Sequence, residues 1–191
     1  MRQMPDNKYT LAIVDPPYGI GNKTFGGKTS KKTRNSQTKF AYHDWDNAIP
    51  KQEYFEELRR VSVNQIIWGG NYFPLSKYRC FIVWDKMTYI PTMSQVELAV
   101  TSFNTPARYV KINSTDPNRI HPTQKPIALY EWLLDNYAKP GDTILDTHLG
   151  SGSIAIACHN CNYDLDAWEL SPEYHANAVA RLQQHSAQLR L

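Results

Sequence analysis

The four residues of DPPY, Asp15 to Tyr18, directly follow an apolar run at residues 11–14. The two prolines fix φ and have no N–H, so the backbone is held extended with carbonyls free to accept hydrogen bonds. Asp15 adds a carboxylate acceptor and Tyr18 a flat ring. These groups suit an exocyclic amine on a planar base, which would donate to Asp15 and to a proline carbonyl and stack on Tyr18. The plainer alternative is a proline-terminated strand with a structural acid.

A second set of residues whose types and spacing suit ligand binding lies in ILDTHLGSGS, residues 144–153. Asp146 ends a predicted strand, and Gly150 and Gly152 lie in the turn into a helix, where absent Cβ atoms and free backbone N–H groups let a ligand approach. Glu169, at the end of the next predicted strand, has a spacing from Asp146 that suits a carboxylate bound to ribose hydroxyls. The alternative is a tight turn that binds nothing.

Asp146 also distinguishes a cofactor that contains a pyrophosphate from one that carries an ammonium group. A pyrophosphate site uses a fuller GxGxxG pattern and is disfavoured by an acid directly before it. The same acid would attract an ammonium group, and S-adenosylmethionine combines such a group with an adenosine. The residues therefore predict S-adenosylmethionine as the cofactor and disfavour a nucleotide-dependent oxidoreductase.

Positive charge is concentrated in residues 20–40, which hold six Lys and Arg residues and no acid, in a chain whose net charge is only +3. The segment is rich in Gly, Ser and Thr and has no helical or strand period, which predicts a long loop. Either it is solvated surface, or it is an arm that contacts phosphates. The residues predicted to bind DNA are Lys28, Lys31, Lys32 and Arg34.

Strands and helices alternate along the chain. Apolar patterns predict strands at 10–14, 65–68, 80–84, 96–103, 143–145 and 165–170, and helices at 50–61, 127–137, 152–159 and 172–189. This order predicts one α/β domain, residues 1–191, with a doubly wound, mostly parallel sheet, helices on both faces and an antiparallel element at one edge. Trp68, Asn71, Trp84, Asp85 and Lys86 follow or end strands, so they are either pocket residues or core packing.

Composition places the chain among globular proteins, with 41% hydrophobic and 20% charged residues. No apolar run approaches the roughly 18 residues that a bilayer span requires, so no membrane association is expected. The N-terminus lacks the apolar core of a signal peptide, and three cysteines cannot pair completely, which favours a reducing cytoplasm. Cys158 and Cys161 form a single CxxC pair, too little to predict a metal site.

Three motifs in one order carry a family resemblance: DPPY at 15–18, HPTQKP at 121–126 and DTHLGSGS at 146–153. Together they resemble the β-group amino-methyltransferases of DNA, specifically the adenine-N6 kind of bacteria and phages, as found in restriction-modification. The resemblance implies a Rossmann-like methyltransferase sheet in which the catalytic strand precedes the cofactor strand. By motif match, the residues that handle a flipped target base would be Asp15, Pro16, Pro17 and Tyr18. The residues that bind the cofactor would be Asp146, His148, Gly150, Ser151, Gly152 and Glu169, with Lys125 at the cofactor's carboxylate.

The chain departs from the family pattern in two ways. Thr147 and His148 replace a Pro-Phe pair, which puts a titratable ring where an apolar one would pack on the cofactor, and a packing role is favoured over proton transfer. The strand that usually follows the cofactor-binding pair is missing, so the sheet is expected to be one strand short or covered at its edge by a partner, for example in a homodimer. No sizeable target-recognition domain is visible, and the basic segment and residues 86–95 are the candidates for sequence recognition.

Three other functions share part of this sequence pattern. The amine chemistry is shared with N4-cytosine methyltransferases and with RNA adenine methyltransferases. Family members acting on cytosine more often have Ser at the first position of DPPY, so Asp15 favours adenine. A non-catalytic nucleic-acid-binding subunit of a methyltransferase is a further alternative, which the intact DPPY and GSG motifs disfavour.

Overall fold

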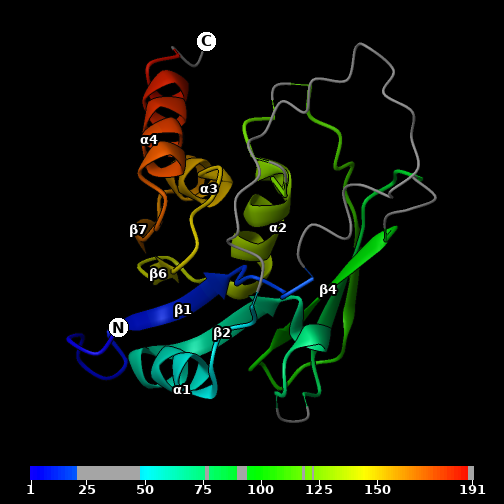
Figure 1. The fold of residues 1–191 in the computed structure, drawn as a ribbon, viewed down its shortest axis with the longest axis vertical. Helices are drawn as coiled ribbons and strands as arrows, with labels where there is room; N and C mark the ends of the chain where they lie inside the picture. Colours follow the sequence, from blue (N-terminus) through cyan, green and yellow to red (C-terminus); the bar gives the residue numbers. More distant parts are fainter. Residues whose placement is uncertain (21–47, 76–77, 90–93, 118, 122, 189–191) are drawn as a thin grey trace.

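The computed structural model describes residues 1–20, 48–75, 78–89, 94–117, 119–121 and 123–188 (Figure 1). Lys28, Lys31, Lys32 and Arg34 lie outside the described residues, so their assignment to DNA binding stays a prediction.

The described residues form seven strands and four α-helices. The strands are β1 (Tyr9–Val14), β2 (Ser62–Trp68), β3 (Phe81–Asp85), β4 (Val96–Thr101), β5 (Arg108–Lys111), β6 (Thr143–Asp146) and β7 (Asp164–Ala167). The helices are α1 (Gln52–Val61), α2 (Ile127–Tyr137), α3 (Ser153–Cys161) and α4 (Pro172–Ser186), with a 3-10 turn, η3 (Gly70–Tyr72), after β2. The predicted α/β fold is confirmed.

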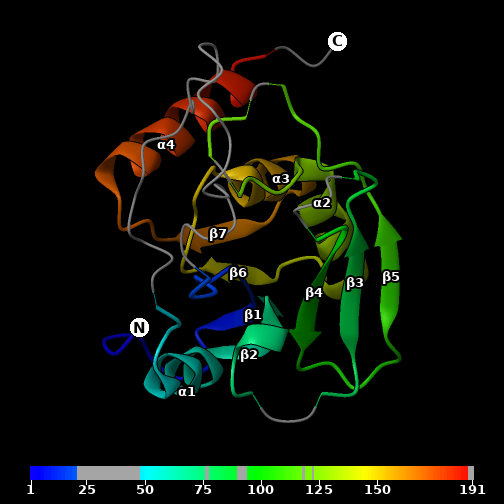
Figure 2. The same ribbon diagram turned by 45° about the vertical axis from the view of Figure 1, so that its right-hand side comes forward.

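All seven strands belong to one sheet in the order β5-β3-β4-β2-β1-β6-β7, and every pairing is parallel except the two made by β4. The prediction that the antiparallel element lies at an edge was wrong, because β4 lies inside the sheet between β3 and β2. In Figure 2 the β4 arrow runs opposite to its neighbour β3 and to β5. Residues 86–95 allow an antiparallel connection from β3 to β4 but are too few for the crossover that parallel neighbours need.

Strand β5 was missed at the sequence level and accounts for the internal position of β4. It is only four residues long, and Val110 is its one buried residue, so its apolar signal is weak. It pairs in parallel with β3 and thereby takes the edge. With β5 the sheet has seven strands, although none of the described strands pairs with the outer side of β7.

Alternate residues of the central strands face two separate cores. In β1, Leu11 and Ile13 contribute to the core under α2 and α3, whereas Ala12 and Val14 contribute to the core under α1. Figure 1 shows α2 and α3 on one side of β1 and β2, and α1 on the other. Helix α1 presents Phe55, Leu58 and Val61, spaced three residues apart, to its core. Helices therefore cover both faces of the sheet, as predicted.

Among the described residues, no helix is both long and apolar enough to cross a membrane.

Candidate active site

The antiparallel direction of β4 decides which residues meet at one rim of the sheet. Parallel strands present their last residues at this rim, whereas β4 presents its first residues, because Val96 pairs with Asp85 at the end of β3. The charged residues that lie at or near these strand ends are Asp15, Asp85, Lys86, Glu97, Lys111, Asp146 and Glu169.

Asp15 accepts a hydrogen bond at each of its carboxylate oxygens. The Tyr18 hydroxyl donates to Oδ1 at 2.6 Å, and the Lys125 ammonium donates to Oδ2 at 2.5 Å. Burial, together with the negative charges of Asp15 and Glu97, raises the pKa of Tyr18 well above its ordinary value, so the phenol stays a donor. The side chain of Asp15 is 18% exposed, and each oxygen keeps lone pairs with which to accept from a further donor.

The ring of Tyr18 stacks on Tyr72, with ring centroids 4.9 Å apart and an interplanar angle of 12°. Gly69 makes room for this ring, because a Cβ at Gly69 would lie 2.1 Å from Cε1 of Tyr18. Gly69 also has a φ of +69°, a conformation that glycine adopts without strain. One face of Tyr18 is therefore already occupied by an aromatic ring, and Tyr72 is a site residue that the sequence reasoning did not single out.

Lys125 was predicted to reach the carboxylate of the cofactor, and its ammonium is instead bound to two carboxylates of the protein. It lies 2.5 Å from Asp15 Oδ2 and 3.1 Å from Glu97 Oε2, and its side chain is only 3% exposed. Burial alone would lower the pKa of Lys125, but the two carboxylates outweigh it and raise the pKa above the ordinary value. Lys125 is therefore a fully charged member of the Asp15 site, and any contact with a cofactor stays a prediction.

Glu97 was missed at the sequence level. It lies in VELAVT, where it is the one charged residue of an otherwise apolar strand ending in Thr101. That pattern is a usable signal, since a charge in a half-buried strand needs a partner. Glu97 binds the ammonium groups of Lys125 and Lys86, the latter at 2.6 Å. Burial alone would raise its pKa, but the two ammonium groups lower it below the ordinary value.

On the predicted cofactor side, Asp146 ends β6 and is almost fully buried. Its Oδ1 accepts the backbone N–H of His148 at 2.9 Å, and it forms no ion pair with any residue that the structure describes. Burial, with smaller contributions from Asp15 and Glu169, raises its pKa to about 7. A buried carboxylate without a cation favours a ligand that brings a positive charge.

His148 lies in a packed and neutral environment. Burial lowers its pKa to about 4. Its Nδ1 lies 2.9 Å from the Thr147 hydroxyl, which in turn lies 2.6 Å from the Tyr54 hydroxyl. The Tyr54 ring meets the imidazole edge to face at 5.6 Å. A neutral imidazole held between these groups suits packing rather than proton transfer, as the sequence reasoning favoured.

The two glycines of the turn have different roles. Both have positive φ, +53° at Gly150 and +73° at Gly152. A Cβ at Gly150 would meet no atom closer than 3.8 Å, whereas at Gly152 it would lie 2.9 Å from Cβ of Ala178 in α4. A side chain at Gly150 would thus be in ordinary contact with His121, without the crowding found at Gly152. At Gly152 the packing of α4 is itself a reason for glycine, and its part in binding a cofactor stays a prediction.

Glu169 lies two residues beyond β7 and is held by the same turn. Its Oε2 accepts the N–H of Gly150 at 2.8 Å, and its Oε1 accepts the N–H of Ser171 at 2.9 Å. Ser151 is buried, and its carbonyl accepts from Arg181 of α4 at 3.0 Å. These bonds fix the carboxylate beside Gly150, and each oxygen keeps a lone pair with which to accept a further donor.

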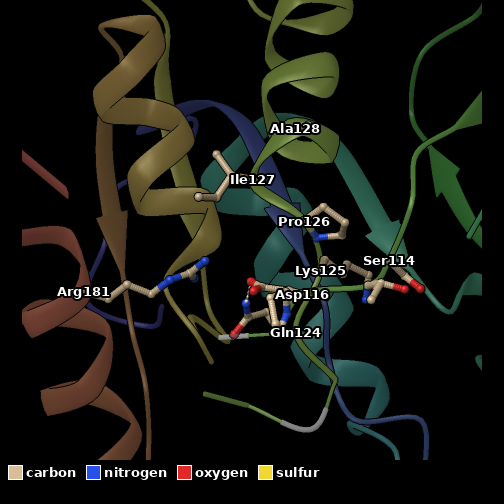
Figure 3. Close-up of a pocket in the computed structure, with 10 residues that line it drawn as sticks. Ser114, Asp116, Gln124, Lys125, Pro126, Ile127, Ala128 and Arg181 are labelled. Atoms are coloured by element: carbon tan, nitrogen blue, oxygen red, sulfur yellow. Dashed lines mark hydrogen bonds between the residues drawn. The ribbon is translucent and has the colours of Figure 1, made fainter. Parts of the chain in front are cut away.

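A cavity of about 280 Å³ lies at the N-terminal end of α2 (Figure 3). Its lining includes Lys125, Asp116, Gln124 and Arg181. Gln124 donates to Asp116 at 2.7 Å, and Figure 3 shows both beside Lys125, with Arg181 approaching from α4. The cavity therefore adjoins the Asp15 site and brings α2 and α4 together around a polar space.

The sheet and this site define the class of protein. Solved structures with the same fold include M1.HpyAVI in complex with S-adenosylmethionine (21% identity, TM-score 0.58, covering 92% of this chain and 90% of that chain). They also include the cytosine-N4-specific PvuII DNA methyltransferase (12% identity, TM-score 0.61, covering 97% and 86%). The fold is that of the S-adenosylmethionine-dependent methyltransferases.

Sequence comparisons give the family. Residues 63–180 match the model of the N6 and N4 DNA methylases. The chain is 34% identical to YubD of Escherichia coli (strain K12), over 95% of this chain and 85% of YubD. It is 22% identical to the type II methyltransferase M.HpaI of Haemophilus parainfluenzae, over 95% of this chain and 70% of M.HpaI. The chain belongs to the DNA methylase family.

Proposed function

We propose that this chain transfers the methyl group of S-adenosylmethionine to the N6 amine of an adenine flipped out of DNA. The observation that carries the proposal is the Asp15 carboxylate, held at the rim of the sheet by Tyr18 and Lys125 with acceptor capacity left over. A carboxylate that accepts from the amine favours the pyramidal nitrogen that attacks the methyl group. S-Adenosylmethionine supplies the methyl group as an electrophile on a sulfonium.

The residues around the predicted cofactor side fit this cofactor. Asp146 offers a buried carboxylate to an ammonium group, Glu169 offers carboxylate oxygens to ribose hydroxyls, and Gly150 adds no side chain beside that carboxylate. These are the groups that S-adenosylmethionine requires, and the neutral His148 adds a ring to pack against it. Their assignment as cofactor contacts is part of the proposal.

The target base would be bound by stacking as well as by hydrogen bonds. Tyr18 is already stacked on Tyr72, so an incoming base has to displace Tyr72 or stack against the pair. A flipped base loses its stacking in the duplex, at a few kcal/mol, and aromatic stacking of about 1–3 kcal/mol would offset part of that. Phosphate contacts from Lys28, Lys31, Lys32 and Arg34 are proposed to supply further binding free energy.

The methylated nucleoside that forms shows whether the target is adenine in DNA, cytosine in DNA, or RNA. The protein is incubated with labelled S-adenosylmethionine and unmethylated DNA or RNA, and the digested nucleosides are separated by mass spectrometry, with Asp15→Ala as the control. We expect N6-methyladenine from DNA and no product from the variant. N4-methylcytosine as the main product, or methylation of RNA alone, would contradict the proposal and leave the cofactor assignment standing.

N4-cytosine methylation is the second candidate. The likeness in fold to the PvuII enzyme and the shared amine chemistry keep it open, since both bases present an exocyclic amine beside a ring nitrogen. Asp at the first position of DPPY favours adenine.

A further inference from the structure

Four side chains form a line of alternating charge that ends at Asp15, here called the charge chain: Lys86, Glu97, Lys125 and Asp15. Its three contacts are 2.6 Å from Lys86 Nζ to Glu97 Oε1, 3.1 Å from Glu97 Oε2 to Lys125 Nζ, and 2.5 Å from Lys125 Nζ to Asp15 Oδ2. Lys125 is the most buried of the four side chains, at 3% exposure, against 14% for Lys86, 18% for Asp15 and 23% for Glu97. The charge chain thus connects Lys86, at the start of residues 86–95, with Asp15, the proposed catalytic carboxylate.

Each charge in this line has a counterpart, and the four sum to zero. Without Glu97, two ammonium groups would face one carboxylate in a largely dehydrated site, where interactions between charges are stronger than in water. Lys125 would then lose one of its two anions, and Asp15 would be the only counter-charge left for it. Glu97 thus holds the Lys125 ammonium in place. Because Lys125 is shared between Glu97 and Asp15, it does not fully neutralise the Asp15 carboxylate.

We propose that Glu97 is a positioning residue for methyl transfer, which holds Lys125 at Asp15 and cancels the positive charge that Lys86 and Lys125 would otherwise impose on the site. The inference rests on the proposed function, because it concerns the residues that would face the target amine and the sulfonium. A net positive charge at Asp15 would oppose the binding of a sulfonium and weaken the carboxylate as an acceptor. Glu97 removes that charge without itself touching the amine.

The first test uses the difference between the cofactor and its product. S-Adenosylmethionine carries a sulfonium, whereas S-adenosylhomocysteine is neutral at sulfur and otherwise shares the same groups. Calorimetry compares the ratio of their dissociation constants in the wild type and in three variants. We expect Glu97→Gln to shift the ratio against S-adenosylmethionine by about tenfold, Lys86→Met to shift it in the opposite direction, and Glu56→Gln, an exposed control on α1, to leave it unchanged.

The second test reads the charge of Lys125 directly and needs no cofactor. Its ammonium titration is followed by NMR of the labelled lysine, assigned from Lys125→Arg. The groups that face Lys125 are Asp15, Tyr18 and Asp146 besides Glu97, with Lys86 beyond Glu97. Because Glu97 favours the charged form, Glu97→Gln should lower the pKa of Lys125 by about one unit or more, and Glu97→Asp, which keeps the charge, should largely restore it.

The outcomes separate this inference from the proposed function. An unchanged ligand ratio together with an unchanged Lys125 titration in Glu97→Gln would overturn the inference, as would a loss of thermal stability with neither quantity altered. If the wild type binds neither ligand, the proposed function fails, and the Lys125 titration alone then decides whether Glu97 holds that charge. Opposite shifts in Glu97→Gln and Lys86→Met support the inference, because a merely structural role would not change sign.

Discussion

The two halves of the proposed site differ in how their carboxylates are compensated. The half around Asp15 is proposed to take the target base and is called the target half; the half around Asp146 is proposed to take the cofactor and is called the cofactor half. In the target half, Asp15 is bound by a hydroxyl and an ammonium, and Glu97 by two ammonium groups. In the cofactor half, Asp146 accepts a backbone N–H and has no ion-pair partner among the described residues. The pKa values reflect this, since the pKa of Glu97 is lowered whereas that of Asp146 is raised to about 7.

The difference indicates what each half lacks in the free protein. The target half is already compensated in charge, so a neutral amine can be accepted there without any new charge being buried. The cofactor half holds a carboxylate that burial disfavours, so a cationic ligand would relieve an existing cost. This division agrees with a neutral base on one side and a positively charged cofactor on the other.

The largest effect is expected from Asp15→Ala, which removes the acceptor of the target half. Methyl transfer should fall by about 10³-fold or more, because an interaction formed with the developing charge is lost. The affinity for S-adenosylmethionine should stay within about tenfold of the wild type, as measured by calorimetry. If cofactor binding disappears together with activity, Asp15 is a cofactor ligand or a folding residue, and the comparison of the two halves fails.

Gly152→Val tests the packing of the cofactor turn. The new side chain would meet Ala178 and would have to adopt a φ of +73°, so the free energy of unfolding should fall by about 2–4 kcal/mol. Chemical denaturation measures this loss. Gly150→Val is the matched control, since a Cβ there meets no atom closer than 3.8 Å, and its loss should be the smaller, about 1–2 kcal/mol from the positive φ. Equal losses in the two variants would contradict the separate roles given to these glycines.

Glu169→Ala should weaken the binding of S-adenosylmethionine by about 1.5–3 kcal/mol, the usual contribution of hydrogen bonds to a charged acceptor. The variant also releases the N–H groups of Gly150 and Ser171, so a thermal melt is needed to show that it stays folded. Affinity equal to that of the wild type would remove the ribose assignment.

The last effect is a dependence of cofactor affinity on pH. In the free protein the pKa of Asp146 is about 7, and only its ionised form attracts an ammonium. Affinity for S-adenosylmethionine should therefore rise from pH 5 to pH 7, by up to about tenfold per unit, and fall above about pH 8 as the α-amino group loses its proton. Calorimetry across this range measures it. Asp146→Asn should lack the rise on the acidic side, and a rise as steep as that of the wild type would exclude Asp146 as its source.

Local sequence was sufficient to predict the parts of the site that depend on one segment. The end of β1 directly before Asp15, the turn at Gly150 and the position of Glu169 near the end of β7 follow from apolar runs that stop at turn residues, since such patterns are set by neighbours in the chain. The α/β class and the helices on both faces follow from the same alternation. The predicted strand at 165–170 ended too late, because β7 ends at Ala167.

The tertiary structure alone decided which charges meet. The direction of β4 brings Glu97 to the rim that Asp15 occupies, and strand order is a property of pairing between distant segments that no local pattern contains. The same holds for Lys125, which is 110 residues from Asp15, and for Gly152, whose neighbour Ala178 comes from a later helix. Periodicity within a segment reports which residues are buried, but the partner of a buried charge is set by the packing of the whole sheet.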